Sequence, residues 1–122
     1  MSKSTIIIKI TIYEKPICTI CHKVVKALVE SGVDFEKVNY YVQTFSKTKL
    51  RSLLKKMKMK PSEVQRKDEK IYKDLKFKEK LYTEDQVLGF MIKHPYLVQR
   101  PIVEKGNKVI LARPPERIIE VF

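Results

Sequence analysis

The chain has 122 residues, of which 43% are hydrophobic, and this is enough for one core but too little for two ordinary domains. It carries 26 Lys and Arg against 14 Asp and Glu, a formal net charge of +12. No apolar run approaches the length of a membrane span, and the first five residues lack the apolar stretch of a signal peptide. We therefore expect a single domain over residues 1–122, cytoplasmic and without a membrane partner.

The positive charge is concentrated between residues 47 and 80, where twelve Lys and two Arg stand against five acidic residues. A surface of this kind attracts anions of any size, including a nucleic-acid backbone. These lysines fall on predicted helices, however, without interleaved aromatic residues or a nucleic-acid-binding motif. We favour a solvated surface and do not expect direct nucleic-acid binding.

The first third of the chain shows the pattern of a strand, a helix and a second strand. Apolar and polar residues alternate over 6–13, which predicts a strand with one face turned inward. A helix is predicted over 19–31, ending at Gly32, since glycine favours the left-handed exit of a helix. A less regular strand follows over 33–41, and a βαβ unit of this length makes the two strands parallel. The helix is predicted from apolar residues at helical spacing: Ile20, Val24, Ala27, Leu28 and Val29.

The middle of the chain carries helix signals only. Ser46 can cap a helix, and Thr83 with Gln86 forms a capping box at the start of another. Pro95 closes that last helix, because the residue before a proline avoids helical geometry. We therefore predict a helical insertion at about residues 46–94. Its expected helices run from Ser46 to before Pro61, over 61–65, over 68–75, and from Thr83 to His94.

The last part of the chain returns to strand patterns. Short apolar runs over 101–104 and 108–111 flank a turn with Gly106, which predicts a hairpin. Pro114-Pro115 then opens a final helix. The fold class is therefore α/β, a four-stranded mixed sheet in the order β-α-β, helical insertion, β-β-α. The face of the final helix that we expect to be buried comprises Ile118, Ile119 and Phe122.

Cys18 and Cys21 lie where the first strand turns into the first helix. The first turn of a helix offers unpaired N–H groups and a partial positive charge, which favour a thiolate over a thiol. Cys18 is therefore the candidate nucleophile, and Lys15 and Lys23 add positive charge nearby. Two intervening residues bring the sulfurs within reach of a disulfide, so Cys21 is a candidate redox partner.

Two other interpretations of the CxxC motif stay open. A zinc site would need two further ligands, for which only His22 and His94 remain, and we expect no metal. Two buried cysteines could also lie together by chance. In a reducing compartment a permanent disulfide is disfavoured, so a catalytic or sensing role is the better explanation.

Further motif residues extend beyond the cysteines and carry a resemblance to a known family. The pattern resembles that of the arsenate reductase family of the glutaredoxin-linked type, a branch of the thioredoxin-like fold that includes the Spx transcription regulators. The resemblance covers nearly the whole chain, and the segment from His94 to Val103 is its most specific part. The matching stretches are Tyr13-x-x-Pro16-x-Cys18, Arg66, His94-Pro95-x-Leu97-x-x-Arg100-Pro101-Ile102-Val103, and Arg113-Pro114.

The resemblance implies a role for each of these residues. Cys18 would be the thiolate that attacks arsenate or a similar oxyanion, and Pro101 would be the cis-proline facing it. The oxyanion would be held by Arg66, Arg100 and Arg113, whose planar guanidinium groups can each meet two oxygens without losing their charge. No bound cofactor is implied; glutathione would be the co-substrate, and glutaredoxin a protein partner.

At two places the chain departs from the reductase pattern. Many arsenate reductases of this type carry His and Asn where this chain has Glu14 and Lys15. They also commonly lack a cysteine at the position of Cys21, whereas Spx regulators have one. The alternative function is therefore an Spx-like regulator that binds RNA polymerase through a Cys18–Cys21 switch. Arg113 favours the enzyme, because Spx-like members generally lack the third arginine.

Overall fold

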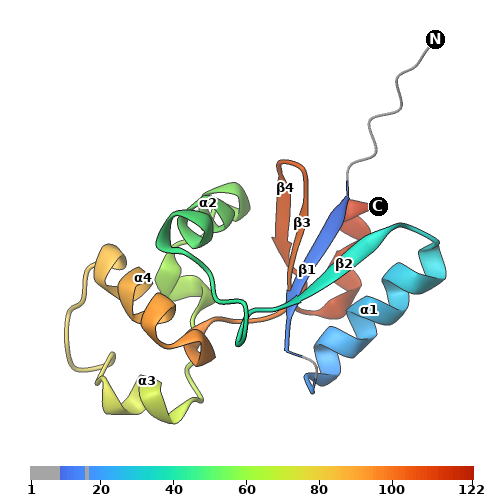
Figure 1. The fold of residues 1–122 in the computed structure, drawn as a ribbon. Helices are drawn as coiled ribbons and strands as arrows, with labels where there is room; N and C mark the ends of the chain where they lie inside the picture. Colours follow the sequence, from blue (N-terminus) through green and yellow to red (C-terminus); the bar gives the residue numbers. More distant parts are fainter. Residues whose placement is uncertain (1–8, 16) are drawn as a thin grey trace.

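The computed structural model describes residues 9–15 and 17–122, as a sheet with helices on both sides (Figure 1). Ile6–Ile8, at the start of the first predicted strand, and Pro16 lie outside the described residues. No helix within these ranges is long and apolar enough to cross a membrane. The elements are β1 (Ile10–Glu14), α1 (Thr19–Ser31), β2 (Phe35–Asn39), α2 (Lys47–Met57), η1 (Pro61–Val64), α3 (Lys70–Asp74), α4 (Glu84–Lys93), η2 (Pro95–Leu97), β3 (Ile102–Lys105), β4 (Lys108–Leu111) and η3 (Pro115–Val121).

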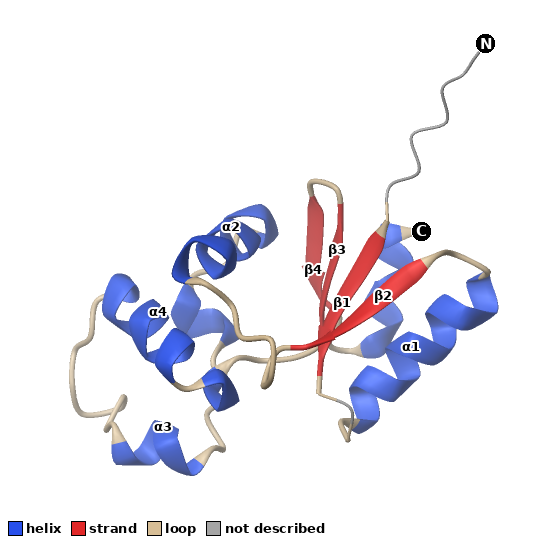
Figure 2. Ribbon diagram, in the orientation of Figure 1, coloured by secondary structure: helices blue, strands red, loops and turns tan. Residues whose placement is uncertain are grey.

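The four strands form one mixed sheet in the order β2-β1-β3-β4 (Figure 2). β1 pairs with β2 in parallel, with Ile10 opposite Phe35, and with β3 in antiparallel, with Ile12 opposite Val103. β3 and β4 form the predicted hairpin, and Gly106 in its turn has a positive φ of 58°. The α/β class and the order β-α-β, helices, β-β-α are confirmed.

Both faces of the sheet are covered, so β1 buries side chains on both sides. Ile10 and Ile12 pack on the face that carries α1 and η3, whereas Tyr13 belongs to the core beneath α2 and α4. Figure 1 shows these two helical groups on opposite sides of the strands. Because successive side chains of a strand point to opposite faces, one strand supplies two separate cores. The prediction of a single inward face for β1 was therefore wrong.

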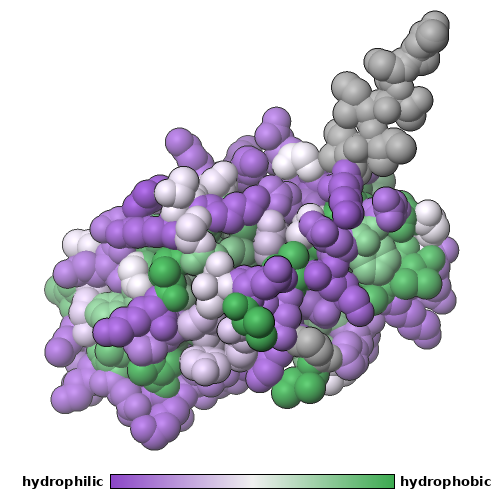
Figure 3. Space-filling model, viewed as in Figure 1, coloured by the Kyte–Doolittle hydropathy of each residue, from purple (hydrophilic) through white to green (hydrophobic). Residues whose placement is uncertain are grey.

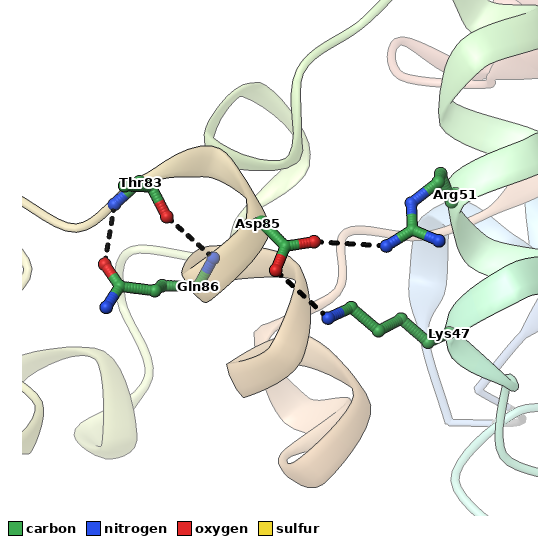
Figure 4. A network of polar contacts seen from close by, with 5 residues as sticks. All are labelled: Lys47, Arg51, Thr83, Asp85 and Gln86. Atoms are coloured by element: carbon green, nitrogen blue, oxygen red, sulfur yellow. Dashed lines mark hydrogen bonds and ion pairs between the residues drawn. The ribbon is translucent and has the colours of Figure 1, made fainter.

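The predicted helix caps are present. Gly32 ends α1 with φ 75°, and the hydroxyl of Ser46 accepts from the backbone N–H of Lys49 at the start of α2. At the start of α4, Thr83 and Gln86 accept hydrogen bonds from each other's backbone N–H groups (Figure 4). These signals depend only on residues within one turn of the chain, so the sequence alone reveals them.

A charged contact joins α2 to α4 at the surface. The carboxylate of Asp85 accepts from Lys47 Nζ at 3.2 Å and from Arg51 Nη2 at 3.1 Å (Figure 4). All three side chains are exposed, so these pairs add little stability. The packing between the two helices comes mainly from buried apolar residues: Leu50, Leu53, Leu54, Val87, Leu88 and Met91.

The C-terminal segment differs from the predicted helix. It is a 3₁₀ helix, and its buried residues are Ile118 and Val121. Ile119 and Phe122 are 70% and 51% exposed, so their prediction as buried was wrong. A 3₁₀ helix has three residues per turn, which places residues 118 and 121 on one side. Val29 of α1 is likewise exposed, because it lies about 100° around the helix from the buried Leu28.

Candidate active site

Cys18 is the N-cap residue of α1, at the carboxyl end of β1. Its backbone is extended, with φ −81° and ψ 121°, and its N–H donates to the carbonyl of Lys15 at 3.0 Å. Its Sγ accepts from the backbone N–H of Cys21 at 3.3 Å. The sulfur therefore occupies the place that a Ser, Thr or Asp oxygen usually takes at a helix start, where negative charge is favoured.

The surroundings of Cys18 favour its thiolate. Burial acts to raise the pKa of the thiol, but hydrogen bonds from Cys21 and from the guanidinium of Arg100 outweigh it and lower the pKa below its ordinary value. Arg100 adds its positive charge to the same effect. The charged neighbour is thus Arg100; the ammonium of Lys15 instead lies 4.8 Å from the ring centroid of Tyr41.

Cys21 is fully buried one turn further along α1. Burial, its hydrogen bond to Cys18 and the nearby charges of Cys18 and Glu14 raise the pKa of its thiol to about 12. Both cysteines are free, so the structure shows the reduced form of the pair. Cys18 is therefore the more acidic thiol of the pair, and Cys21 keeps its proton at neutral pH.

Arg100 lies directly before β3 and is only 8% exposed. Its Nη1 donates to the hydroxyl of Tyr41 at 3.1 Å, and its guanidinium carbon lies 5.9 Å from the centre of that ring. Its Nε is buried and has no hydrogen-bond partner within the described residues. A buried charged donor without an acceptor is costly, which makes this group ready for an anionic ligand.

Arg66 is held by backbone pairing against the segment that leads to Arg100. Its N–H donates to the carbonyl of Leu97 at 2.6 Å, and Gln65 forms an antiparallel bridge with Val98. The guanidinium reaches Asp68 at 3.3 Å through Nη2, and among the described residues its buried Nε has no partner. Arg66 and Arg100 thus each keep a buried Nε–H that has no partner among the described residues.

Arg113 approaches the same region from the end of β4. Its Nη1 donates to the carbonyl of Arg100 at 2.9 Å, and the preceding N–H of Ala112 donates to the carbonyl of Pro101 at 2.9 Å. The Arg100–Pro101 and Arg113–Pro114 peptide bonds are both cis. Within the described residues Arg100 is the arginine that contacts the Cys18 sulfur. Arg113 contacts the backbone carbonyl of Arg100, whereas Arg66 pairs with the backbone of Leu97.

Tyr41 orients Arg100 through its hydroxyl and carries the Lys15 ammonium over its ring, and it is not among the site residues predicted from the sequence. A signal for it existed. The carboxyl ends of parallel strands meet at one edge of a sheet, where ligands bind, and Tyr41 follows β2 just as Cys18 follows β1. Figure 1 shows these two ends converging with the segment that enters β3.

Glu14 is a second residue of interest, because it is 4% exposed and its Oε2 has no partner among the described residues. It stands at the last position of β1, and its charge contributes to the raised pKa of Cys21. The described residues hold no group of three or more His, Cys, Asp or Glu side chains that could bind a metal.

The ArsC family profile matches residues 13–121, which span the cysteines and all three arginines. The chain belongs to the ArsC family. The arsenate reductase of Acidiphilium multivorum is 30% identical over 113 residues, covering 93% of this chain and 80% of that protein. The Escherichia coli K12 protein YfgD, described as uncharacterized, is 32% identical over 114 residues, covering 93% of this chain and 96% of that protein.

Solved structures agree with this assignment. The arsenate reductase from Vibrio cholerae superposes with a TM-score of 0.89 at 25% identity, covering 94% of this chain and 98% of that one. The expected membership of the arsenate reductase family is thereby confirmed, together with its thioredoxin-like four-stranded sheet. For this ArsC-family protein, the relatives indicate an oxidoreductase acting on an oxyanion.

Proposed function

We propose that this protein reduces arsenate, or an oxyanion of similar size and charge, through the thiolate of Cys18. The observation that carries the proposal is the pairing of Cys18 with Arg100, whose guanidinium lowers the pKa of the thiol and keeps an unpaired Nε–H. The relatives named arsenate reductase support the choice of substrate. Arg66 and Arg113 would complete the anion site.

The proposed reaction has three steps. The Cys18 thiolate attacks the As(V) centre and displaces one oxygen, which leaves as water after taking up a proton, so that a sulfur–arsenic bond forms. The arginine N–H groups stabilise the negative charge on the remaining oxygens. A glutathione thiolate then attacks the Cys18 sulfur, and the electron pair of the sulfur–arsenic bond passes to arsenic, which leaves as As(III). The remaining Cys18–glutathione disulfide is reduced by glutaredoxin.

The direct test is arsenite production by the purified protein with glutathione and glutaredoxin. We expect arsenite to form with wild-type protein and to fall to background with Cys18→Ser. A matched control is Cys21→Ser, which keeps the nucleophile and should retain turnover. Absence of arsenite from the wild-type reaction, with each reductant tested, would overturn the proposal.

The second candidate function is an Spx-like regulator, and the observation that favours it is Cys21, one turn from Cys18. In that function the Cys18–Cys21 disulfide would alter a surface that binds RNA polymerase. Capture of purified RNA polymerase by the oxidised protein but not by the reduced protein would support it. Arsenite production without polymerase binding would exclude it.

A further inference from the structure

A ligand-sized hollow lies on the helical part of the molecule, and neither cysteine lines it. It has a volume of 210 Å³, the space of about seven water molecules, and adjoins a hollow of 260 Å³. Lys67, Tyr72 and Phe77 line both hollows, which are here together called the Gln65 hollow. Its first part is lined by Ser62, Gln65, Lys67, Tyr72, Phe77, Lys80, Leu81, Tyr82, Glu84 and Val87.

Gln65 supplies a polar group to the wall of this hollow. The side chain is 6% exposed, and its Nε2 has no hydrogen-bond partner within the described residues. A buried donor left unpaired is costly, and such groups in folded proteins are almost always satisfied. An acceptor oxygen that entered the wall beside Gln65 would remove this cost.

The charges around the Gln65 hollow are mostly positive. The surrounding lysines are exposed, and within the described residues none of them makes an ion pair. Of the two acidic residues, Glu84 already accepts from the backbone N–H and the hydroxyl of Ser62, at 2.9 and 3.0 Å. The other, Glu79, is exposed at the outer part. The lysines are Lys67, Lys73, Lys76, Lys78 and Lys80.

Aromatic rings form the rest of the wall. The rings of Tyr72 and Phe77 are stacked, with 5.0 Å between their centroids and 17° between their planes. The ring of Tyr82 meets that of Phe77 edge-on, with 5.2 Å between the centroids. Figure 3 shows a surface that is hydrophilic over most of the drawn face, interrupted by small hydrophobic areas. The hollow therefore combines flat aromatic walls with lysine ammonium groups and the Gln65 amide. This combination suits a ligand that has an apolar part and an anionic group.

We propose that the Gln65 hollow binds a small organic anion that carries a phosphate or carboxylate group on a flat apolar body. Gln65 would donate to the anionic group, the lysines would supply charge, and Tyr72 and Phe77 would contact the apolar part. The site differs from the oxyanion site. Gln65 and Arg66 are adjacent in an extended segment paired with Val98, and successive side chains of such a segment point to opposite sides.

The test is binding of three probes, phenyl phosphate, phthalate and inorganic phosphate, followed by the amide signals of isotope-labelled protein. We expect phenyl phosphate or phthalate to shift the signals of Gln65, Lys67 and Lys80. Inorganic phosphate, which lacks a ring, should shift them at least several-fold more weakly. A preference between phenyl phosphate and phthalate identifies the anionic group of the natural ligand. The signals of Cys18 and Arg100 report separately on the oxyanion site, so failure of the proposed function would not be mistaken for failure here.

Variants sharpen the test. Gln65→Leu should weaken binding by about tenfold, because it removes a hydrogen bond to a charged group. Lys80→Ala should weaken it by up to about fivefold, and because this side chain is exposed the variant will fold. Lys26→Ala on α1 removes the same charge at a different place and should leave the binding of each probe unchanged. Equal binding of all three probes, or equal weakening by Lys80→Ala and Lys26→Ala, would overturn the proposal.

Discussion

Arg100 contacts the Cys18 sulfur and also keeps an unpaired donor that could bind the substrate oxyanion. A guanidinium has five N–H donors in a fixed plane. In the structure Nη1 donates to the Tyr41 hydroxyl and the guanidinium also donates to the Cys18 sulfur, while the buried Nε–H has no partner among the described residues. A lysine ammonium carries the same charge on a single nitrogen, so it could not donate hydrogen bonds to Cys18, Tyr41 and an oxyanion from the same positions.

The first prediction follows from this geometry. Arg100→Lys should lower kcat/KM for arsenate by about a hundredfold, the usual effect of removing one aligned donor from a transition state. Arg51→Lys on the exposed face of α2 is the matched control and should leave kcat/KM unchanged. Steady-state arsenite production measures both. Equal activity of the two variants would place the oxyanion elsewhere.

The second prediction concerns the two thiols. Since hydrogen bonds from Cys21 and Arg100 lower the pKa of Cys18 while burial raises the pKa of Cys21 to about 12, the two should differ strongly in reactivity at neutral pH. Alkylation by iodoacetamide should be rapid in Cys21→Ser at pH 6–7 and very slow in Cys18→Ser. Similar rates for the two variants across this range would contradict the assignment.

The role of a residue could be predicted from the sequence only where that residue belongs to a recognisable motif. Cys18 and the arginines stand in recognisable patterns, so the sequence placed them in one site. Tyr41 lies 59 positions before its partner Arg100 and belongs to no motif, which is why it was missed. The predicted influence of Lys15 on Cys18 was drawn from sequence proximity, whereas the structure turns its ammonium toward the Tyr41 ring.

Among the elements, α1 was the most predictable, because both of its ends carry local signals. Cys18 begins it and Gly32 ends it in the left-handed conformation, as the sequence indicated. The burial of single residues was less predictable. Whether Ile119 and Phe122 are buried depends on whether the last segment is an α or a 3₁₀ helix. Packing against the sheet decides this, not local propensity.

A pair of glycines gives the third prediction. Gly32 has φ +75° with open space around its missing Cβ, so Gly32→Ala should destabilise the fold by about 1 kcal/mol through backbone strain alone. Gly89 lies within α4, also with open space, and Gly89→Ala should stabilise by about 0.5–1 kcal/mol. Chemical denaturation measures both. Shifts of the same sign would refute the conformational explanation.

The fourth prediction concerns Cys21, which α1 holds one turn from Cys18. Because the helix fixes the second thiol in place, its effective concentration should far exceed that of glutathione. Cys21 should therefore displace glutathione from a Cys18–glutathione disulfide, forming the Cys18–Cys21 disulfide and releasing reduced glutathione. Mass spectrometry of protein treated with oxidised glutathione should show a two-dalton loss for wild type and a glutathione adduct for Cys21→Ser.

The same experiment can reject this role. A stable glutathione adduct on wild-type protein would show that Cys21 does not reach the Cys18 sulfur, and that its burial in α1 serves packing only. Val24→Ala, a core change on the same helix that leaves both thiols in place, is a control for general loosening of α1. It should still show the two-dalton loss.

At the scale of the whole molecule, Glu104 joins parts of the chain that are distant in sequence. It lies on β3, and its Oε1 accepts from the hydroxyl of Tyr13 on β1 at 2.7 Å and from Lys49 Nζ on α2 at 3.0 Å. The partners are 91 and 55 positions away, so no local pattern could have indicated this contact. Such non-local polar contacts fix how the helical part sits against the sheet.

The last prediction is the pH dependence of this contact. Burial acts to raise the pKa of Glu104, but hydrogen bonds from Tyr13 and Lys49 outweigh it and hold the pKa below its ordinary value of 4.5. A carboxylate with a depressed pKa in the folded state stabilises the fold above pH 4.5, and the contribution is lost as the pH falls through the lower folded-state value. Glu104→Gln should therefore cost about 1–2 kcal/mol at pH 7 and progressively less below pH 4.5. Glu36→Gln, which removes an exposed carboxylate 3.4 Å from Lys9, is the control and should cost little at any pH. Urea unfolding from pH 7 to pH 3 measures both variants, and a Glu104→Gln cost that stays constant over this range would show that the contact stabilises through shape rather than charge.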